Sequence, residues 1–207
     1  AMGDTIYSKG FNDLRAEIDA AIGNLDFLND PEALDKREQL QAMAICADAL
    51  IAFARRHAEA LGALAAAAES GERRRELQTM AAICRRVPAE APRTFWEALQ
   101  YYWFVHVGVI TELNPWDAFN PGRLDQHLYP FYEADLAAGR LTRERARELL
   151  AAFWVKFNNH PAPPKVGITA KESNTYVDFA LINLGGVKVD GSDGVNELTY
   201  LILDVIE

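Results

Sequence analysis

Cysteine is scarce in this sequence of 207 residues. Only Cys46 and Cys84 occur, and neither a Cys-x-x-Cys pair nor a cysteine–histidine cluster is present. The sequence therefore gives no basis for a zinc or iron–sulfur site. Both cysteines stand among alanines and isoleucines in helical patterns, where a free cysteine behaves as a small hydrophobe. We expect both to be buried and no structural disulfide to form.

Long apolar runs and an excess of positive charge are also missing. No apolar run approaches the ~20 residues that span a bilayer, and the basic-then-apolar pattern of a secretory signal is absent. The net charge is -9, whereas nucleic-acid binders need a basic face. Half of the residues are hydrophobic and a quarter are charged, as in soluble globular proteins. We expect a cytoplasmic protein with no membrane or nucleic-acid partner.

Apolar residues recur at helical spacing through the first part of the chain, residues 3–91. The pattern predicts a helix from Ile6 to Leu25, a second that Asp30 caps, and a third after a break at Ser70-Gly71. We expect this part to be a helical scaffold. The inward face predicted for the second helix consists of Leu34, Leu40, Met43, Ala44, Ala47, Leu50, Ile51 and Ala54.

Residues 92–207 begin with helix signals and end with strand signals. Thr94 and Glu97 are spaced as a capping box that opens a buried aromatic helix. A short acidic helix follows the Tyr129-Pro130 pair and stops at Gly139, and Thr142 caps the next helix. After a proline-rich stretch, the residues predict strands over 165–169 and 178–184, then a last helix capped by Ser192-Asp193.

The fold class that follows is mainly α with a few late β-strands. Strands that arrive only near the end, after a helical layer, are typical of one part of a larger α/β body. We expect the chain to hold the helical layer and the first strands of an incomplete α/β barrel.

Two aspartates are candidates for proton chemistry. Asp117 stands in a proline-bounded aromatic loop, and Asp178 lies between Val177 and Phe179 in a predicted strand. An acid with apolar neighbours is desolvated, which raises its pKa and suits it to donate a proton. The structural alternatives are a turn or helix cap for Asp117 and a paired core acid for Asp178.

Three further polar residues have a structural and a functional interpretation. Arg123 and Asp125 either anchor a loop or bind an anionic substrate, and anchoring is favoured because a guanidinium readily ties down backbone carbonyls. His106 is favoured as a hydrogen-bonded core residue over a catalytic base. The Gly185-Gly186 pair lacks the spacing, lysine and hydroxyl of a phosphate loop.

Longer motifs carry a family resemblance. The runs are CRRVPAEAPRTFWEALQYYWFVH, NPGRLDQHLYPFYEADLAAGRLT, LINLGG and DGSDGVNELTYLILD. Together they resemble the glycyl radical enzymes, the pyruvate formate-lyase-like superfamily, and the resemblance covers residues 3–207. It implies an α/β barrel wrapped by helices, in which a radical glycine loop meets a catalytic cysteine loop.

Within that superfamily, ITELNPWDAFNPGRLDQH and NNHPAPPKVGITAKESNTYVDFALINLGG are most similar to the hydroxyproline dehydratase branch. This similarity implies that Asp117 is a catalytic acid and that Ser173, Asp178 and Phe179 contact the substrate. It implies that Ser173 and the backbone amide of Phe179 hold the substrate carboxylate. Asp178 and Asp117 would face the ring nitrogen and the leaving hydroxyl, in an order that stays open.

The sequence departs from the family pattern in lacking the Gly-Cys-Val-Glu loop and the radical glycine loop. We expect a fragment that is inactive alone and binds neither metal nor cofactor. The resemblance implies that the parent protein is a homodimer and carries a glycyl radical, installed by an activating enzyme that uses S-adenosylmethionine and an iron–sulfur cluster. The alternatives are a formate C-acetyltransferase, a glycerol or diol dehydratase, an amine or sulfonate lyase, or a non-catalytic helical scaffold.

Overall fold

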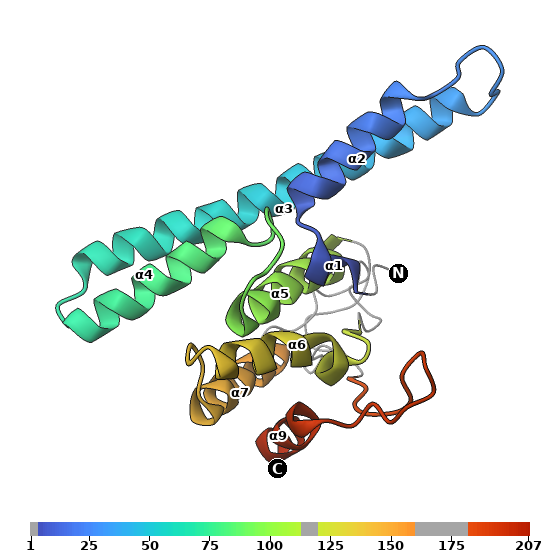
Figure 1. Ribbon diagram of the computed structural model, residues 1–207. Helices are drawn as coiled ribbons and strands as arrows, with labels where there is room; N and C mark the ends of the chain where they lie inside the picture. Colours follow the sequence, from blue (N-terminus) through green and yellow to red (C-terminus); the bar gives the residue numbers. More distant parts are fainter. Residues whose placement is uncertain (1–3, 113–119, 160–181) are drawn as a thin grey trace, which may run out of the picture. The chain divides into compact units, whose positions relative to one another are not determined.

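The computed structural model describes residues 4–112, 120–159 and 182–207. These residues form two compact units, 2–92 and 93–207, and each is described by itself (Figure 1). No helix among them is both long and apolar enough to cross a membrane. The elements in chain order are α1 (Thr5–Ser8), α2 (Phe11–Gly23), α3 (Ala33–Ala67), α4 (Gly71–Arg86), α5 (Phe95–Glu112), α6 (Leu124–Ala137), α7 (Arg143–Asn159) and α9 (Glu197–Ile206).

In unit 2–92, α2 and α4 pack along the two halves of the long helix α3 (Figure 1). The helix predicted from Ile6 is interrupted at Gly10, where the start of α2 lies against the loop after α4. Phe11 N donates to Pro88 O at 2.8 Å, and a Cβ at Gly10 would lie 2.3 Å from Ala89 O. Only glycine permits this approach, so one predicted helix becomes two.

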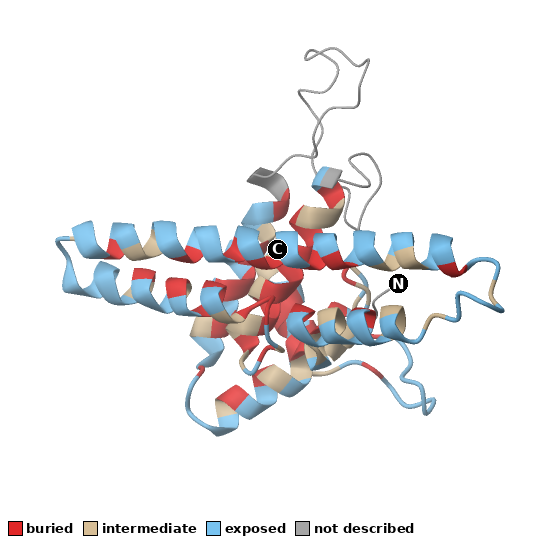
Figure 2. Ribbon diagram, turned by 90° about the horizontal axis from the view of Figure 1, so that it is seen from above, coloured by how far each residue is buried: buried red, intermediate tan, exposed pale blue. Residues whose placement is uncertain are grey.

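The buried face of α3 is made largely of alanine, which lets neighbouring helices approach closely. The predicted inward positions Ala44, Ala47, Ile51 and Ala54 are buried. Leu34 and Met43 are 58% and 56% exposed, so those two predictions were wrong. Cys84 is buried but Cys46 is exposed, which corrects that expectation as well. Apolar residues recur on more than one face of α3, and the alanine face is the one that packs (Figure 2).

The alanine face gives a stability prediction. Ala58 is 1% exposed, and we expect Ala58→Leu to lower the free energy of unfolding by about 1–3 kcal/mol, because extra methyl groups force apart packed helices. Ala60 is exposed on the same helix, and Ala60→Leu should change stability by less than about 0.5 kcal/mol. Urea unfolding of both variants decides the matter, and equal effects would contradict the packing described.

Unit 93–207 is built around α5, whose aromatic residues are buried nearly all round (Figure 2). The Thr94 half of the predicted capping box is confirmed, because Thr94 Oγ1 accepts from Glu97 N at 3.2 Å. Glu97 Oε2 accepts from Arg93 N at 2.7 Å, one residue before the amide that a capping box uses. Thr142 likewise caps α7 by accepting from Arg145 N at 3.1 Å. These bonds satisfy amide groups that a helix start leaves without partners.

The start of α6 differs from the prediction. The helix begins at Leu124 and contains Pro130, whereas the sequence suggested a start after that proline. A proline inside a helix removes one backbone hydrogen bond, and here the helix continues through it. Gly139, with φ of 67°, follows the end of α6 as predicted.

Among residues 4–112, 120–159 and 182–207 the expected late β-strands are not found, and the mainly-α-with-strands fold class was wrong in that respect. In residues 182–207 the structure shows only isolated bridges, Arg123 with Asn183 and Val187 with Asp193. A ladder needs a partner of several extended residues, and here the partner passes into α6 at Leu124. Residues 165–169 lie outside the described part, as do most of 178–184. The described residues form helices joined by turns and loops, with isolated bridges in place of a sheet.

The cap of the last helix also differs from the prediction. Asn196, not Ser192-Asp193, caps α9 by accepting from Leu198 N at 2.9 Å. Thr199 completes the capping box, because its Oγ1 accepts from Asn196 N at 3.0 Å. Ser192 and Asp193 lie in the preceding turn, where Ser192 donates to Asp190. Asparagine is as good a cap as serine or aspartate, and Asn196 was not among the caps considered from the sequence.

A buried carboxylate joins α5 to α6. Asp135 is 3% exposed, and its Oδ2 accepts from Phe95 N at 2.8 Å. Its Oδ1 accepts from Arg140 Nε at 2.8 Å. A side chain in the last turn of α6 thus satisfies an amide at the start of α5.

We expect Asp135→Asn to lower the free energy of unfolding by about 1–3 kcal/mol, because two charge-assisted bonds are weakened. The measurement is urea unfolding, with Glu133→Gln as control, since Glu133 is an exposed acid on the same helix. A loss no larger than the control's would show that the carboxylate contributes nothing.

Candidate functional site

The four residues predicted to form the site lie outside the described residues. Asp117 falls in 113–119, and Ser173, Asp178 and Phe179 fall in 160–181. Their roles therefore stay predictions. The structure does show how unit 93–207 holds the four points at which these two segments leave and rejoin the described chain.

The two points of departure are the ends of α5 and α7, and aromatic rings join the last turn of α7 to the middle of α5. The ring centroids of Trp103 and Phe157 are 5.4 Å apart, and those of His106 and Phe157 are 5.0 Å apart. His106 is fully buried, and its Nδ1 lies 2.9 Å from Tyr102 Oη. The prediction of a hydrogen-bonded core histidine is confirmed. This packing of large rings ties the last turn of α7 to the middle of α5.

The two points of return meet in a short backbone pairing. Leu124 N donates to Asn183 O, and Asn183 N donates to Gly122 O, each at 3.3 Å. The chain that comes from Asp117 and the chain that comes from Asp178 therefore run side by side as they re-enter the described structure.

A fully buried carboxylate holds the second return point. Asp125, in the first turn of α6, is 0% exposed. Its Oδ2 accepts from Gly185 N at 2.7 Å and from Thr199 Oγ1 at 2.5 Å, and its Oδ1 accepts from Gln126 N at 2.8 Å. Gln126 Nε2 donates to Gly185 O at 2.7 Å. The peptide groups on both sides of Gly185 are thus held by α6.

Two glycines make this arrangement possible. Gly185 has φ of 64°, and a Cβ there would lie 2.9 Å from Val195 Cγ2. A Cβ at Gly194 would lie 2.2 Å from Gln126 Nε2, and Gly194 N donates to Gly186 O at 2.6 Å. The Gly185-Gly186 pair serves a tight turn, in agreement with its lack of phosphate-loop features.

Arg123 contributes to the same turn through its side chain. Its Nη1 donates to the carbonyl oxygen of Val187. The interpretation of Arg123 and Asp125 as loop anchors is confirmed. Each of them binds backbone groups of residues 183–187 on its own, so the anchoring does not depend on an ion pair between the two. In the turn that follows, hydrogen bonds from Ser192 hold the pKa of the Asp190 carboxyl below its usual range.

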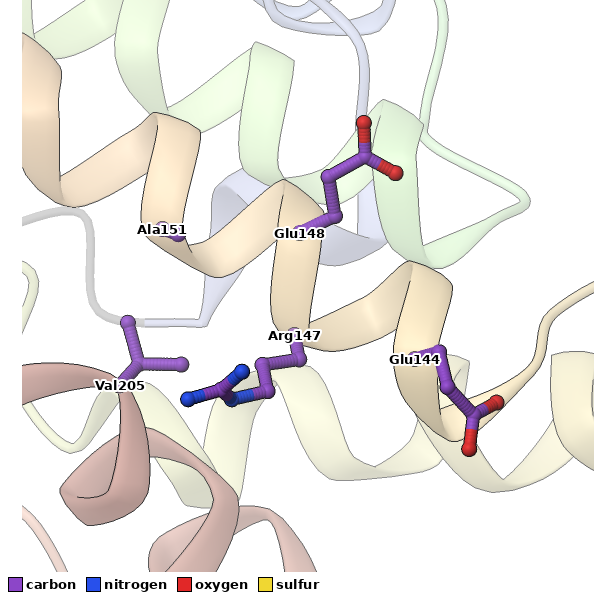
Figure 3. A pocket seen from close by; sticks show the side chains of 5 residues that line it. All are labelled: Glu144, Arg147, Glu148, Ala151 and Val205. Carbon is purple, nitrogen blue, oxygen red and sulfur yellow. The ribbon is translucent and has the colours of Figure 1, made fainter.

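A separate surface groove of about 400 Å³ lies between α7 and α9 (Figure 3). Glu144, Arg147, Glu148, Ala151 and Val205 line it. The two glutamates point outward and Arg147 lies beside Val205 (Figure 3). Its charged side chains are exposed, so the groove lacks the desolvated acid or base that catalysis requires. Within residues 4–112, 120–159 and 182–207, no group of three metal-binding side chains occurs.

Comparison with known proteins decides the family. The family model described as pyruvate formate lyase-like matches residues 1–207. The chain belongs to the pyruvate formate lyase-like family. This agrees with the resemblance found in the sequence motifs.

Individual relatives of this pyruvate formate lyase-like chain are dehydratases and lyases. The chain is 57% identical over 205 residues to trans-4-hydroxy-L-proline dehydratase of Clostridioides difficile, covering 99% of this chain and 26% of that protein. It is 37% identical to isethionate sulfite-lyase of Nitratidesulfovibrio vulgaris, over 97% of this chain and 24% of the relative.

Solved structures give the same relationship. The crystal structure of hydroxyproline dehydratase from Clostridioides difficile, with trans-4-hydroxy-L-proline bound, matches with a TM-score of 0.92 at 57% identity, covering 99% of this chain and 26% of the other. A glycerol dehydratase from Clostridium butyricum matches with a TM-score of 0.86 at 28% identity, over 98% and 25% of the two chains. This chain thus spans about a quarter of the length of the relatives it matches.

Sequence reasoning missed most residues that hold the turn at Gly185. Thr199 and Gln126 gave no signal, because their partners are distant in sequence and one of them is a backbone group. Asp125 was noticed, and its position between Leu124 and Leu128 on the buried side of a helix was the available signal. Gly194 could have been suspected only from its place in a glycine-containing turn.

The turn at Gly185 gives a testable prediction. Gly185→Ala should destabilise the chain more than Gly139→Ala. Both residues have positive φ, but a Cβ at Gly139 meets nothing within 4 Å, whereas one at Gly185 lies 2.9 Å from Val195 Cγ2. Each substitution carries a backbone cost of about 1 kcal/mol. Thermal unfolding should show an additional loss for Gly185→Ala, and equal losses would mean that Val195 moves aside freely.

Proposed function

We propose that this chain is the substrate-side part of a glycyl radical dehydratase that removes water from trans-4-hydroxy-L-proline. The observation that carries the proposal is the 57% identity over 99% of the chain to a dehydratase of that name. The similarity in fold to its substrate-bound structure, with a TM-score of 0.92, supports it. Residues 3–91 would serve as helical scaffold and 92–207 as the wall that faces the substrate.

The residues proposed to touch the substrate suit its chemistry. Hydroxyproline carries a carboxylate, a ring nitrogen and a hydroxyl group. The Ser173 hydroxyl and the Phe179 amide would donate to the carboxylate, since bonds to an ionised acceptor are stronger than neutral ones. Asp178 and Asp117 would serve the ring nitrogen and the leaving hydroxyl. A hydroxyl leaves as water only after it gains a proton, which is the purpose of a nearby acid.

The radical chemistry would come from residues beyond this sequence. The chain has no Gly-Cys-Val-Glu motif, and relatives include a glycyl radical enzyme from Archaeoglobus fulgidus. We propose that the full-length protein is a cytoplasmic homodimer that supplies the thiyl cysteine and radical glycine. A radical S-adenosylmethionine enzyme would install the radical. This chain's residues would bind and orient the substrate and supply the proton.

The proposal is tested with the full-length protein that contains this chain, activated under anaerobic conditions. We expect loss of trans-4-hydroxy-L-proline in proportion to the radical content measured by electron paramagnetic resonance. Isethionate, glycerol, 1,2-propanediol, and pyruvate with coenzyme A are the comparison substrates, because they represent other branches of the family. Turnover of one of these with hydroxyproline untouched would refute the proposed substrate.

Two variants test the roles within that reaction. Ser173→Ala should raise KM by about 10- to 100-fold, because a hydrogen bond to a charged group contributes about 1.5–3 kcal/mol. Asp117→Asn should lower kcat by about 100-fold or more, as expected when an acid catalyst is lost. Ser192→Ala is the control, since that exposed hydroxyl donates to Asp190 in a surface turn. If Ser173→Ala behaves like Ser192→Ala, the proposed carboxylate site is wrong.

A further inference from the structure

We propose that Asp125 is a positioning residue for the dehydratase reaction, acting through the backbone of residues 183–187. The inference rests on the proposed function for its kinetic consequence. The group concerned, called here the Asp125 clamp, consists of Asp125, Gln126, Gly185 and Thr199. None of the four is among the residues proposed to contact the substrate, which are Asp117, Ser173, Asp178 and Phe179.

Every hydrogen bond of the clamp involves Asp125 or Gly185, and both residues are buried. A fully buried carboxylate must be satisfied by donors, and Asp125 has three, from Gly185 N, Thr199 Oγ1 and Gln126 N. Bonds to an ionised oxygen are short and directional. The clamp therefore fixes a definite position for the peptide before Gly185 relative to both α6 and α9.

The clamp also fixes the register of the chain that returns from the segment of Asp178. Backbone pairing holds Asn183, the clamp holds Gly185, and the Arg123 guanidinium holds the carbonyl of Val187. Residues 122–126, at the start of α6, thus form hydrogen bonds with every second residue of the segment: Asn183, Gly185 and Val187. A shift by one residue would place the wrong backbone groups against Asp125 and Gln126.

The segment that contains Asp117 rejoins the described chain just before α6 and leads into it through Gly122 and Arg123. The clamp therefore sets the spacing between the two return points. Under the proposed function, one of them leads to the acid and the other to the carboxylate-binding residues. Displacement of about 1 Å can cost about a hundredfold in rate, so loss of the clamp should reduce catalysis without removal of any group that touches substrate.

A structural role alone would predict only lower stability, and Asp135 provides the matched control. Asp135 is the other buried carboxylate of α6, at the opposite end of the helix, and it too accepts from a backbone amide. Asp125→Asn and Asp135→Asn each neutralise one buried acid. They differ in whether residues 183–187 lose an anchor.

The experiment uses the full-length, activated protein below the unfolding range of all variants, with rates divided by radical content. We expect Asp125→Asn and Thr199→Val to lower kcat/KM for hydroxyproline by about tenfold or more, and Thr199→Ser, which keeps the hydroxyl, to restore it. Asp135→Asn should stay within about twofold of wild type. Amide hydrogen exchange in residues 182–187 should be faster in Asp125→Asn and unchanged in Asp135→Asn.

Failure of the clamp and failure of the proposed function give different results. If wild-type protein turns over another substrate of the panel, the proposed function is wrong, and the same variants are compared on that substrate. If no substrate is turned over, hydrogen exchange decides. The clamp proposal is overturned if Asp125→Asn leaves kcat/KM within twofold of wild type, if Asp135→Asn lowers it equally, or if exchange in 182–187 does not change.

Discussion

Two buried carboxylates on one helix organise unit 93–207. Asp125 in the first turn of α6 and Asp135 in its last turn are 0% and 3% exposed. A buried carboxylate is costly unless donors surround it, so each dictates where a distant part of the chain must lie. Asp135 fixes the start of α5, and Asp125 fixes the turn at Gly185 and the first turn of α9. Helix α6 is in this way the common support of the elements around it.

This support matters because two chain segments, which leave from the ends of α5 and α7, return beside the start of α6. Phe157 in the last turn of α7 packs against Trp103 in the middle of α5, and the return points share the pairing of Gly122–Leu124 with Asn183. Segments that carry binding residues need a rigid base, because loops by themselves hold side chains loosely. The relatives that the chain matches include a hydroxyproline dehydratase, an isethionate sulfite-lyase and a glycerol dehydratase.

What the sequence predicted well was local. Helix starts at Ser70, Thr94 and Thr142 follow from a side-chain oxygen within reach of nearby amides, and His106 is buried because its helix has few charges. What it missed depends on partners distant in the chain. Leu34 and Met43 lie on a face of α3 that nothing in the described structure covers fully, and the strand signal near Asn183 lacked a long enough partner. The motifs led to the right family, whereas Asp117, Ser173, Asp178 and Phe179 lie outside the described residues.

We propose that this chain supplies the substrate-facing residues of a hydroxyproline dehydratase, held in place from α6. A crystal structure of the full-length protein with trans-4-hydroxy-L-proline tests it most directly. We expect Ser173 Oγ and Phe179 N to lie within hydrogen-bond distance of the substrate carboxylate, about 2.7–3.2 Å, with Asp117 and Asp178 at the ring nitrogen and hydroxyl. A substrate bound elsewhere, or one that contacts none of these four residues, would contradict it.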